Sequence, residues 1–84
     1  MKQDIRPAQL RAARALIGWS RERLALEVDL TERTIARIED ADTSPRQSTL
    51  AAIRTALEAA GVIFIDQNGE GPGVRLKKDK HNET

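Results

Sequence analysis

The feature that most restricts the fold is a pair of short helical segments with almost no chain between them. Ser20 precedes RERLALEV, and Thr31 precedes a second segment within TERTIARIED, residues 31–40. A serine or threonine at this position caps a helix, because its side-chain oxygen accepts a hydrogen bond from a backbone N–H of the first turn. Asp29 breaks the first segment. The sequence therefore predicts two helices joined across three or four residues.

The second of these segments divides into two opposite sides when it is wound as a helix. At about 100° per residue, Ile35 and Ile38 fall on one side, and Arg33 and Arg37 fall almost diametrically opposite. Like charges four residues apart repel, and Asp40 is the only acid nearby that offsets Arg37. The arginine side is therefore either a solvated face or a surface that presents two guanidinium groups to a partner.

Two further helices are predicted, one on each side of this pair. The first, over residues 5–17, has apolar residues at helical spacing: Leu10, Ala13, Leu16 and Ile17. Pro7 suits a first turn, and Gly18 suits a helix end. The last helix is expected to have Ser48 as its cap and Gly61 as its terminator, with an apolar stripe of Leu50, Ile53, Leu57 and Ala60. Pro45 forbids a continuous helix through ADTSPRQ, which reads as a loop.

The pattern changes period after Gly61. VIFID is a run of β-branched and aromatic residues, QNGEGPG supplies three glycines and a proline, and VRLK alternates apolar with basic residues. Together they predict a β-hairpin over residues 62–78. Because residues 62–65 are all apolar, both faces of that strand require cover, and the helices can supply only one. We therefore expect the hairpin to mediate dimerisation through Val62, Ile63, Phe64, Ile65, Val74 and Leu76. The alternative is that it packs only on its own helices.

Length and composition narrow the class of protein. The predicted fold is mainly α, with a four-helix domain over residues 1–61, a hairpin over 62–78, and a charged tail over 79–84 that is expected to be disordered. A core of this size gives only a few kcal/mol of stability, which favours a dimer. Cysteine is absent, so disulfides and thiolate metal sites are excluded. With no signal peptide and no apolar run of membrane length, we expect a cytoplasmic protein that binds no membrane and no cofactor.

The basic residues are unevenly distributed along the chain. The formal net charge of +1 argues neither for nor against a nucleic-acid partner. Residues 1–23, however, carry six basic residues against two acidic ones, whereas residues 24–60 carry four arginines against seven acids. Ten of the fourteen basic residues are arginine, whose planar guanidinium suits phosphate and guanine edges better than the lysine ammonium does. The distribution is suggestive of nucleic-acid recognition without identifying it.

The segment LRAARALIGWSRERLALEVDLTERTIARIED resembles the XRE-type family of lambda-repressor-like helix-turn-helix domains, found in phage repressors, restriction-modification controller proteins and many antitoxins. The likeness runs from about Leu10 to Gly61. It rests on a linked set of features: the Trp-Ser entry to the second helix, the Leu-Ala pair at residues 24 and 25, the Thr31 cap, and the ending formed by Ile35, Ile38 and Glu39. It implies that the helix after Thr31 enters the major groove of double-stranded DNA.

The resemblance also assigns roles to individual residues. Those that match base-reading positions are Glu32, Arg33, Thr34 and Arg37. Those that match positions near the DNA backbone are Arg21, Thr31, Ser44 and Arg46. An arginine of the first helix often pairs in this family with the glutamate that closes the recognition helix, which here implies a structural ion pair of Arg14 with Glu39.

Two departures from the family pattern affect these expectations. Asp29 stands where relatives usually have a glycine in the left-handed conformation, which aspartate tolerates better than most residues. The hairpin replaces the fifth helix through which several relatives dimerise, so the dimer geometry does not carry over.

Other interpretations have less support in the sequence. An enzyme is not expected, because His81 is the only histidine and no acid pair accompanies an evident nucleophile. DQNGEG, residues 66–71, imitates the opening of a calcium loop, but Lys77 at the twelfth position repels the ion, so a glycine-rich turn is preferred. Trp19 could stack on a base, although a position at the edge of the core between the first two helices fits better.

The sequence thus favours a sequence-specific, homodimeric DNA-binding transcriptional regulator, a repressor that acts also on its own promoter and occupies a palindromic operator. Because so short a chain leaves no room for a sensor domain, repression is the default expectation. The alternative is an antitoxin or antiactivator, a protein-interaction module built on the same scaffold.

Overall fold

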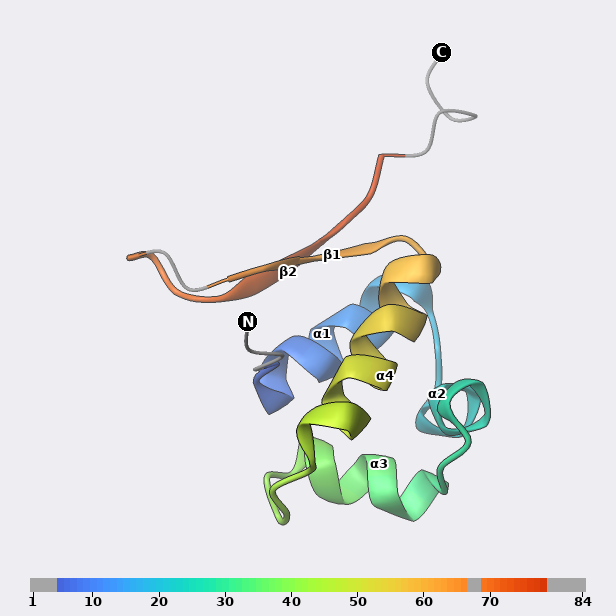
Figure 1. Ribbon diagram of the computed structural model, residues 1–84. Helices are drawn as coiled ribbons and strands as arrows, with labels where there is room; N and C mark the ends of the chain where they lie inside the picture. The colour runs from blue at the N-terminus through green and yellow to red at the C-terminus, as the bar shows by residue number, and fades with distance from the viewer. Residues whose placement is uncertain (1–4, 67–68, 79–84) are drawn as a thin grey trace.

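The computed structural model describes residues 5–66 and 69–78 of the 84-residue chain. Its elements, in chain order, are α1 (Pro7–Ile17), α2 (Arg21–Val28), α3 (Glu32–Glu39), α4 (Gln47–Ala59), β1 (Val62–Ile65) and β2 (Gly73–Leu76). The four helices pack together, and the hairpin lies across one end of the group, opposite α3 (Figure 1). The mainly α class with a C-terminal hairpin is therefore confirmed. The predicted tail, including His81, and residues 67–68 of the hairpin loop lie outside the described residues.

The helix ends follow local hydrogen bonding. Pro7 is the first residue of α1, and Gly18 ends that helix in the left-handed conformation at φ 69°. Ser20 and Thr31 cap α2 and α3 as expected, accepting hydrogen bonds from the backbone N–H of Arg23 and Thr34. These four positions confirm the sequence predictions, because each depends on contacts within three residues.

The start of α4 differs from the prediction. The sequence suggested Ser48 as the cap, but Arg46 is the N-cap residue, with extended backbone at φ −67° and ψ 155°. The first helical hydrogen bond runs from the N–H of Leu50 to the carbonyl of Arg46, at 3.0 Å. The helix has therefore already begun when the chain reaches Ser48, whose hydroxyl is not needed as a cap. Pro45 lies one residue before this cap and outside the helix, where its missing N–H removes no helical hydrogen bond.

One apolar core serves all four helices and the hairpin. Its buried members are Leu10, Ala13, Leu24, Ala25, Ile35, Ile38, Ile53, Leu57, Val62 and Phe64. Trp19 packs against the edge of this core, as predicted, and its ring is covered by the guanidinium carbon of Arg23, 4.6 Å from the ring centroid. Among the described residues, no helix is long and apolar enough to cross a membrane.

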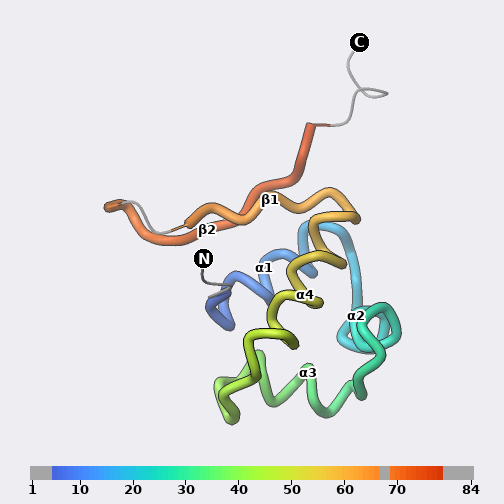
Figure 2. The backbone as a smooth tube through the Cα atoms, viewed as in Figure 1, coloured from blue at the N-terminus to red at the C-terminus, as the bar shows by residue number. Residues whose placement is uncertain are grey.

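The hairpin is held on the helices by a buried glutamine that the sequence patterns did not single out. The strands pair antiparallel, with Val62 opposite Leu76 and Ile65 opposite Gly73. The Nε2 of Gln9, in α1, donates to the carbonyl of Gly73 at 2.9 Å and to that of Ile65 at 3.3 Å. Its Oε1 accepts from the backbone N–H of Arg6. Gln9 therefore ties the start of α1 to the loop end of the hairpin, which extends beyond the helices (Figure 2).

Candidate nucleic-acid interface

The turn between α2 and α3 is short and built by backbone geometry. Asp29 adopts the left-handed conformation, at φ 59° and ψ 45°, at the position where the family usually has a glycine in that conformation. The N–H of Leu30 then donates back to the carbonyl of Ala25 at 2.9 Å, which closes the end of α2. Thr31 follows at once as the cap of α3. Residues 21–39 therefore form a helix-turn-helix in which only three residues, 29–31, separate the two helices.

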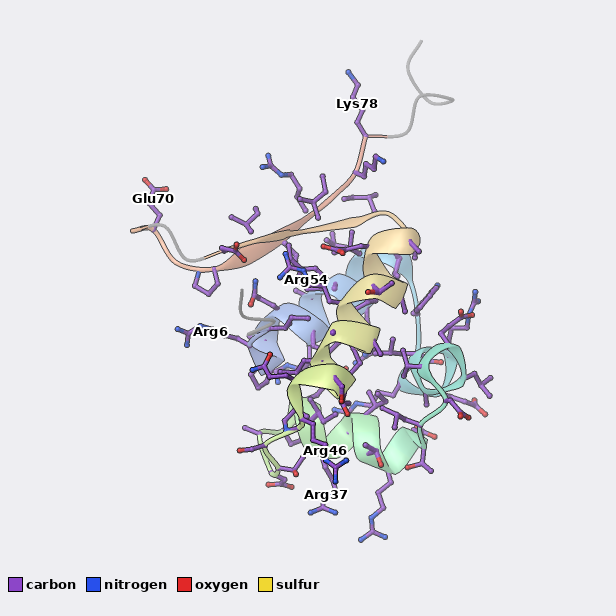
Figure 3. All side chains as sticks on the ribbon, viewed as in Figure 1. Arg6, Arg37, Arg46, Arg54, Glu70 and Lys78 are labelled. Carbon is purple, nitrogen blue, oxygen red and sulfur yellow. The ribbon has the colours of Figure 1, made fainter. Side chains whose placement is uncertain are left out.

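The faces of α3 are divided as the sequence predicted. Ile35, Ile38 and Glu39 are buried. Glu32, Arg33 and Arg37 are exposed, and Thr34 is half-buried beside the hydroxyl of Thr31, 2.9 Å away. Figure 3 shows Arg37 at the α3 end of the molecule, pointing away from the other helices. The four residues that match base-reading positions thus lie on or beside one outward face of a single helix.

The arginines of this surface have no acidic partner within the described chain. In residues 5–66 and 69–78, the guanidinium groups of Arg33, Arg37 and Arg46 make no ion pair and no hydrogen bond. Asp40, which the sequence offered to Arg37, is instead 3.6 Å from Arg21. Three positive charges therefore remain available to an external anion, and Figure 3 shows two of the residues, Arg37 and Arg46, at the α3 end of the molecule.

The orientation of α3 is set by a cluster of arginines around one buried carboxylate. The side chain of Glu39 has no exposed surface, and its Oε2 and Oε1 accept from Arg14 at 2.5 Å and 2.8 Å. Arg21 adds a hydrogen bond to Oε1 at 2.9 Å. Arg14 also donates to the carbonyl of Trp19, and Arg11 donates to the backbone carbonyl of Glu39. Residues from α1 and α2 thereby converge on the last residue of α3.

These contacts keep the carboxylate ionised. Burial raises the pKa of Glu39, but the hydrogen bonds and charges of Arg14 and Arg21 outweigh burial and hold the pKa below its ordinary value of 4.5. The hydrogen bond to Glu39 correspondingly raises the pKa of Arg14, against the opposing effect of burial. A single buried carboxylate with two arginines has no unpaired polar atom, and among the described residues no buried side-chain nitrogen or oxygen lacks a hydrogen-bond partner.

The end of α3 uses a backbone motif that normally takes glycine. The N–H of Ala41 donates to the carbonyl of Ile38 at 3.1 Å, and the N–H of Asp42 donates to that of Arg37 at 2.8 Å. This is the Schellman arrangement, whose middle residue must be left-handed. Ala41 fills that position at φ 60°. The pattern of polar residues predicted a loop here but did not identify the alanine as strained.

The residues matched to DNA-backbone positions lie in different surroundings. Thr31 caps α3, and Ser44 and Arg46 are exposed in the loop between α3 and α4. Arg21 differs, because its guanidinium already contacts Glu39 and Asp40, although its side chain remains 34% exposed. Its position beside α3 is consistent with a second role in holding that helix.

The residues expected to mediate dimerisation divide between the interior and the surface. Val62 and Phe64 are buried in the core of their own chain, and Ile65 and Val74 are half-buried. Ile63 and Leu76 remain exposed, at 38% and 52%. The hairpin thus packs on its own helices with one face and keeps apolar side chains in solvent.

The described residues offer no metal-binding cluster. In residues 5–66 and 69–78, no group of three or more histidine, cysteine, aspartate or glutamate side chains lies close enough to hold an ion. Asn68 of the calcium-like segment lies outside the described residues.

A comparison with family models agrees with this geometry. Residues 10–59, more than half of the chain, match the model described as Helix-turn-helix, and the match spans α1 to α4. A search of curated proteins finds no match. The two short capped helices, the tight turn and the outward face of α3 all lie inside the matched region. The chain therefore belongs to the XRE-type helix-turn-helix family of DNA-binding domains.

Proposed function

We propose that the protein is a sequence-specific, homodimeric transcriptional regulator that inserts α3 of each copy into the major groove of one half of a two-fold symmetric operator. The observation that carries this proposal is the outward face of α3, where Arg33 and Arg37 have no partner among the described residues. An unpaired arginine pair on a helix that is fixed from behind by a buried ion pair is suited to read base edges. Family membership supports the same use of the helix.

The chemistry of each side chain suggests its target. Arginine pairs with O6 and N7 of guanine through two hydrogen bonds, and each such contact contributes about 1 to 3 kcal/mol of discrimination. Arg33 and Arg37 are the residues proposed for this role. Glu32 accepts from N4 of cytosine or keeps the arginines extended, and the methyl group of Thr34 suits contact with a thymine methyl.

The surrounding residues are proposed to position the helix by contacting phosphates. Arg46 carries an unpartnered guanidinium in the described chain, and Ser44 supplies a hydroxyl from the same loop. Thr31 stands at the N-terminus of α3, where backbone N–H groups and the helix dipole favour an anion. Arg21 has N–H groups beyond those on Glu39, so it can reach a phosphate while it holds α3.

The proposed regulation results from binding of the dimer to promoter DNA. A dimer bound across a promoter excludes polymerase from the same DNA, so repression is the proposed outcome, including repression of the protein's own promoter. The two-fold symmetry of a dimer requires an operator with two related half-sites about one helical turn apart.

The proposal is tested by footprinting on the DNA upstream of the gene. We expect protection of two symmetric half-sites, with nanomolar affinity and a steep decrease in affinity as salt rises. A shuffled sequence of the same composition is the matched control, and it should bind far more weakly at the same salt. Equal affinity for the two sequences would overturn the proposal, and would instead favour a protein-interaction module.

A further inference from the structure

The hairpin has two free edges, and the backbone hydrogen bonds define them. The N–H of Lys77 donates to the carbonyl of Gly61 at 2.6 Å, so Gly61 and Lys77 form a hydrogen-bonded pair. In an antiparallel ladder such pairs alternate, so the register makes Ile63 with Arg75 the next one. The backbone groups of the residues between them point outward. Val62 and Phe64 therefore present their N–H and carbonyl groups along the outer edge of β1, with which no other described segment forms backbone hydrogen bonds.

The two edges differ in charge. The outer edge of β2 is flanked by Arg75, Lys77 and Lys78. Charged residues on an edge strand, lysine above all, oppose pairing with another strand, and a second copy would bring like charges together. β1 reads Val-Ile-Phe-Ile and has no charged side chain of its own. Arg54 lies over the Phe64 ring and Asp66 follows the strand, but these two charges are opposite in sign and 3.9 Å apart. The β1 edge is therefore apolar and carries no excess of one charge, which is the kind of edge that pairs with a further strand.

The position of α3 distinguishes two possible contacts between the hairpins of two copies, stacking of their faces and pairing of their edges. The hairpin and α3 lie at opposite ends of the molecule, with α1 and α4 between them (Figure 1). If the outer faces of two hairpins stacked, the two α3 helices would point away from each other and could not share one DNA duplex. If two hairpins pair by their edges, the two sets of helices lie on the same side of one sheet, and both α3 helices face the same way.

We infer that β1 pairs antiparallel with β1 of a second copy, so that two hairpins form one four-stranded sheet. This inference rests on the proposed function, because it uses the requirement that both α3 helices meet one operator. The two-fold axis is perpendicular to the sheet and passes beside Ile63. Val62 of each copy then pairs with Phe64 of the other through the outer backbone groups, and the two Ile63 side chains, each 38% exposed, cover one another.

The absence of cysteine makes this arrangement testable by crosslinking. Opposed residues of a non-hydrogen-bonded antiparallel pair have Cα atoms about 4.5 Å apart, which lies within the range that a disulfide spans. Ile63→Cys should therefore form a covalent dimer under mild oxidation. Leu76→Cys is the matched control, because Leu76 is also an exposed apolar residue of the hairpin. It lies on β2, an edge strand of the proposed sheet, so the two Leu76 residues of a dimer are at least about 14 Å apart. Crosslinking of Leu76→Cys as fast as that of Ile63→Cys would overturn the inference.

A charge-pair experiment provides a second readout. Ile63→Lys and Ile63→Glu place like charges together in each homodimer, so the mass measured by light scattering should fall from that of two chains to the 9.3 kDa of one. Mixing the two variants should restore the dimer mass, because opposite charges then face each other. Helical circular dichroism like that of the parent confirms that both variants fold. A dimer mass for Ile63→Lys alone would contradict the inference.

The failure of this inference and the failure of the proposed function give different results. If the parent protein binds the operator as a dimer that Ile63→Lys does not dissociate, DNA recognition stands and the pairing through β1 is wrong. If the Ile63→Cys dimer forms but neither it nor the parent prefers the operator to shuffled DNA, the pairing stands and the proposed function is wrong.

Discussion

The carboxylate of Glu39, the last residue of α3, lies 2.5 Å from the Nε of Arg14 in α1, and the side chain of Glu39 has no exposed surface. A buried carboxylate held by fixed donors opposes rotation or sliding of the helix, because a shift that separates it from those donors leaves a charge unpaired in the interior. The ion pair therefore fixes the direction in which the opposite side of α3 presents Arg33 and Arg37.

Replacing Arg14 tests the energetic importance of this pair. Removing one partner of a buried ion pair costs about 3 to 5 kcal/mol, and the lower end applies to Arg14→Ala because Arg21 remains on the carboxylate. Urea unfolding of parent and variant gives the difference in the free energy of unfolding. Glu27→Ala is the control, since it breaks the exposed pair with Arg23 and should cost less than about 1 kcal/mol. An unfolding midpoint for Arg14→Ala close to that of the parent would contradict a structural role.

The same carboxylate predicts how stability depends on pH. Because the pKa of Glu39 is lower in the folded protein than its ordinary value of 4.5, the folded state favours the ionised form more strongly than the unfolded state does. The resulting stabilisation is fully present above the ordinary value and is lost as pH falls through the folded pKa. Glu39→Gln cannot titrate, so its free energy of unfolding should decrease less than that of the parent below about pH 4.5. Parallel curves for the two proteins would show that Glu39 is not the group responsible.

The parts of the fold that could be predicted from sequence are those determined by near neighbours. Ser20 and Thr31 each accept a hydrogen bond from the backbone N–H three residues later in the chain. Gly18 ends α1 by adopting the left-handed conformation that glycine tolerates. The faces of α3 follow from helical periodicity alone. The predicted cap of α4, Ser48, lies two residues after the observed one. Serine is a favoured capping residue, but it is Arg46 that has the extended backbone of an N-cap. Arg46 makes no capping hydrogen bond with its side chain, so a preference for capping side chains cannot identify it.

Contacts between distant segments could not be predicted from the pattern. Gln9 reaches the carbonyls of Ile65 and Gly73, which are 56 and 64 residues away, and Arg11 reaches the carbonyl of Glu39. A glutamine or arginine on a helix is usually a surface residue, so its type and spacing gave no sign of either contact. The pairing of Arg14 with Glu39 was expected only from the family resemblance, which contributes information on such distant pairs.

Gln9 should matter to the hairpin more than its polar character suggests. Gln9→Met keeps the length of the side chain but leaves two strand carbonyls without this donor, at a cost of about 1 to 3 kcal/mol. Hydrogen exchange at the amides of Ile63 and Arg75 measures opening of the hairpin. We expect faster exchange there than in the parent. Gln9→Glu retains the acceptor for the Arg6 amide and still removes the donor, so it should also accelerate exchange; parent-like exchange in both variants would show that the hairpin does not depend on Gln9.

Glycine at position 41 should stabilise the end of α3. Ala41 has φ 60°, a conformation that costs an L-residue about 1 to 2 kcal/mol and costs glycine almost nothing. The greater freedom of glycine in the unfolded chain offsets about 0.4 to 1 kcal/mol of this gain. Ala41→Gly should therefore raise the free energy of unfolding by up to about 1.5 kcal/mol. Ala52→Gly, in the exposed middle of α4, should lower it by about 1 kcal/mol. A loss of stability in Ala41→Gly would show that its left-handed backbone is not strained.

Two arginines on the same end of the molecule should affect DNA binding in different ways. If Arg37 reads a guanine, Arg37→Ala weakens operator binding by about 1 to 3 kcal/mol and relaxes the preference at one base position. If Arg46 contacts a phosphate, Arg46→Ala weakens operator and shuffled DNA about equally and reduces the salt slope by about one. Both residues are exposed and lack partners in the described chain, so neither change should alter the fold. Affinities measured on both DNAs at several salt concentrations separate the roles. Equal losses on operator and shuffled DNA for Arg37→Ala would assign Arg37 to the backbone, because a contact with phosphate does not depend on sequence.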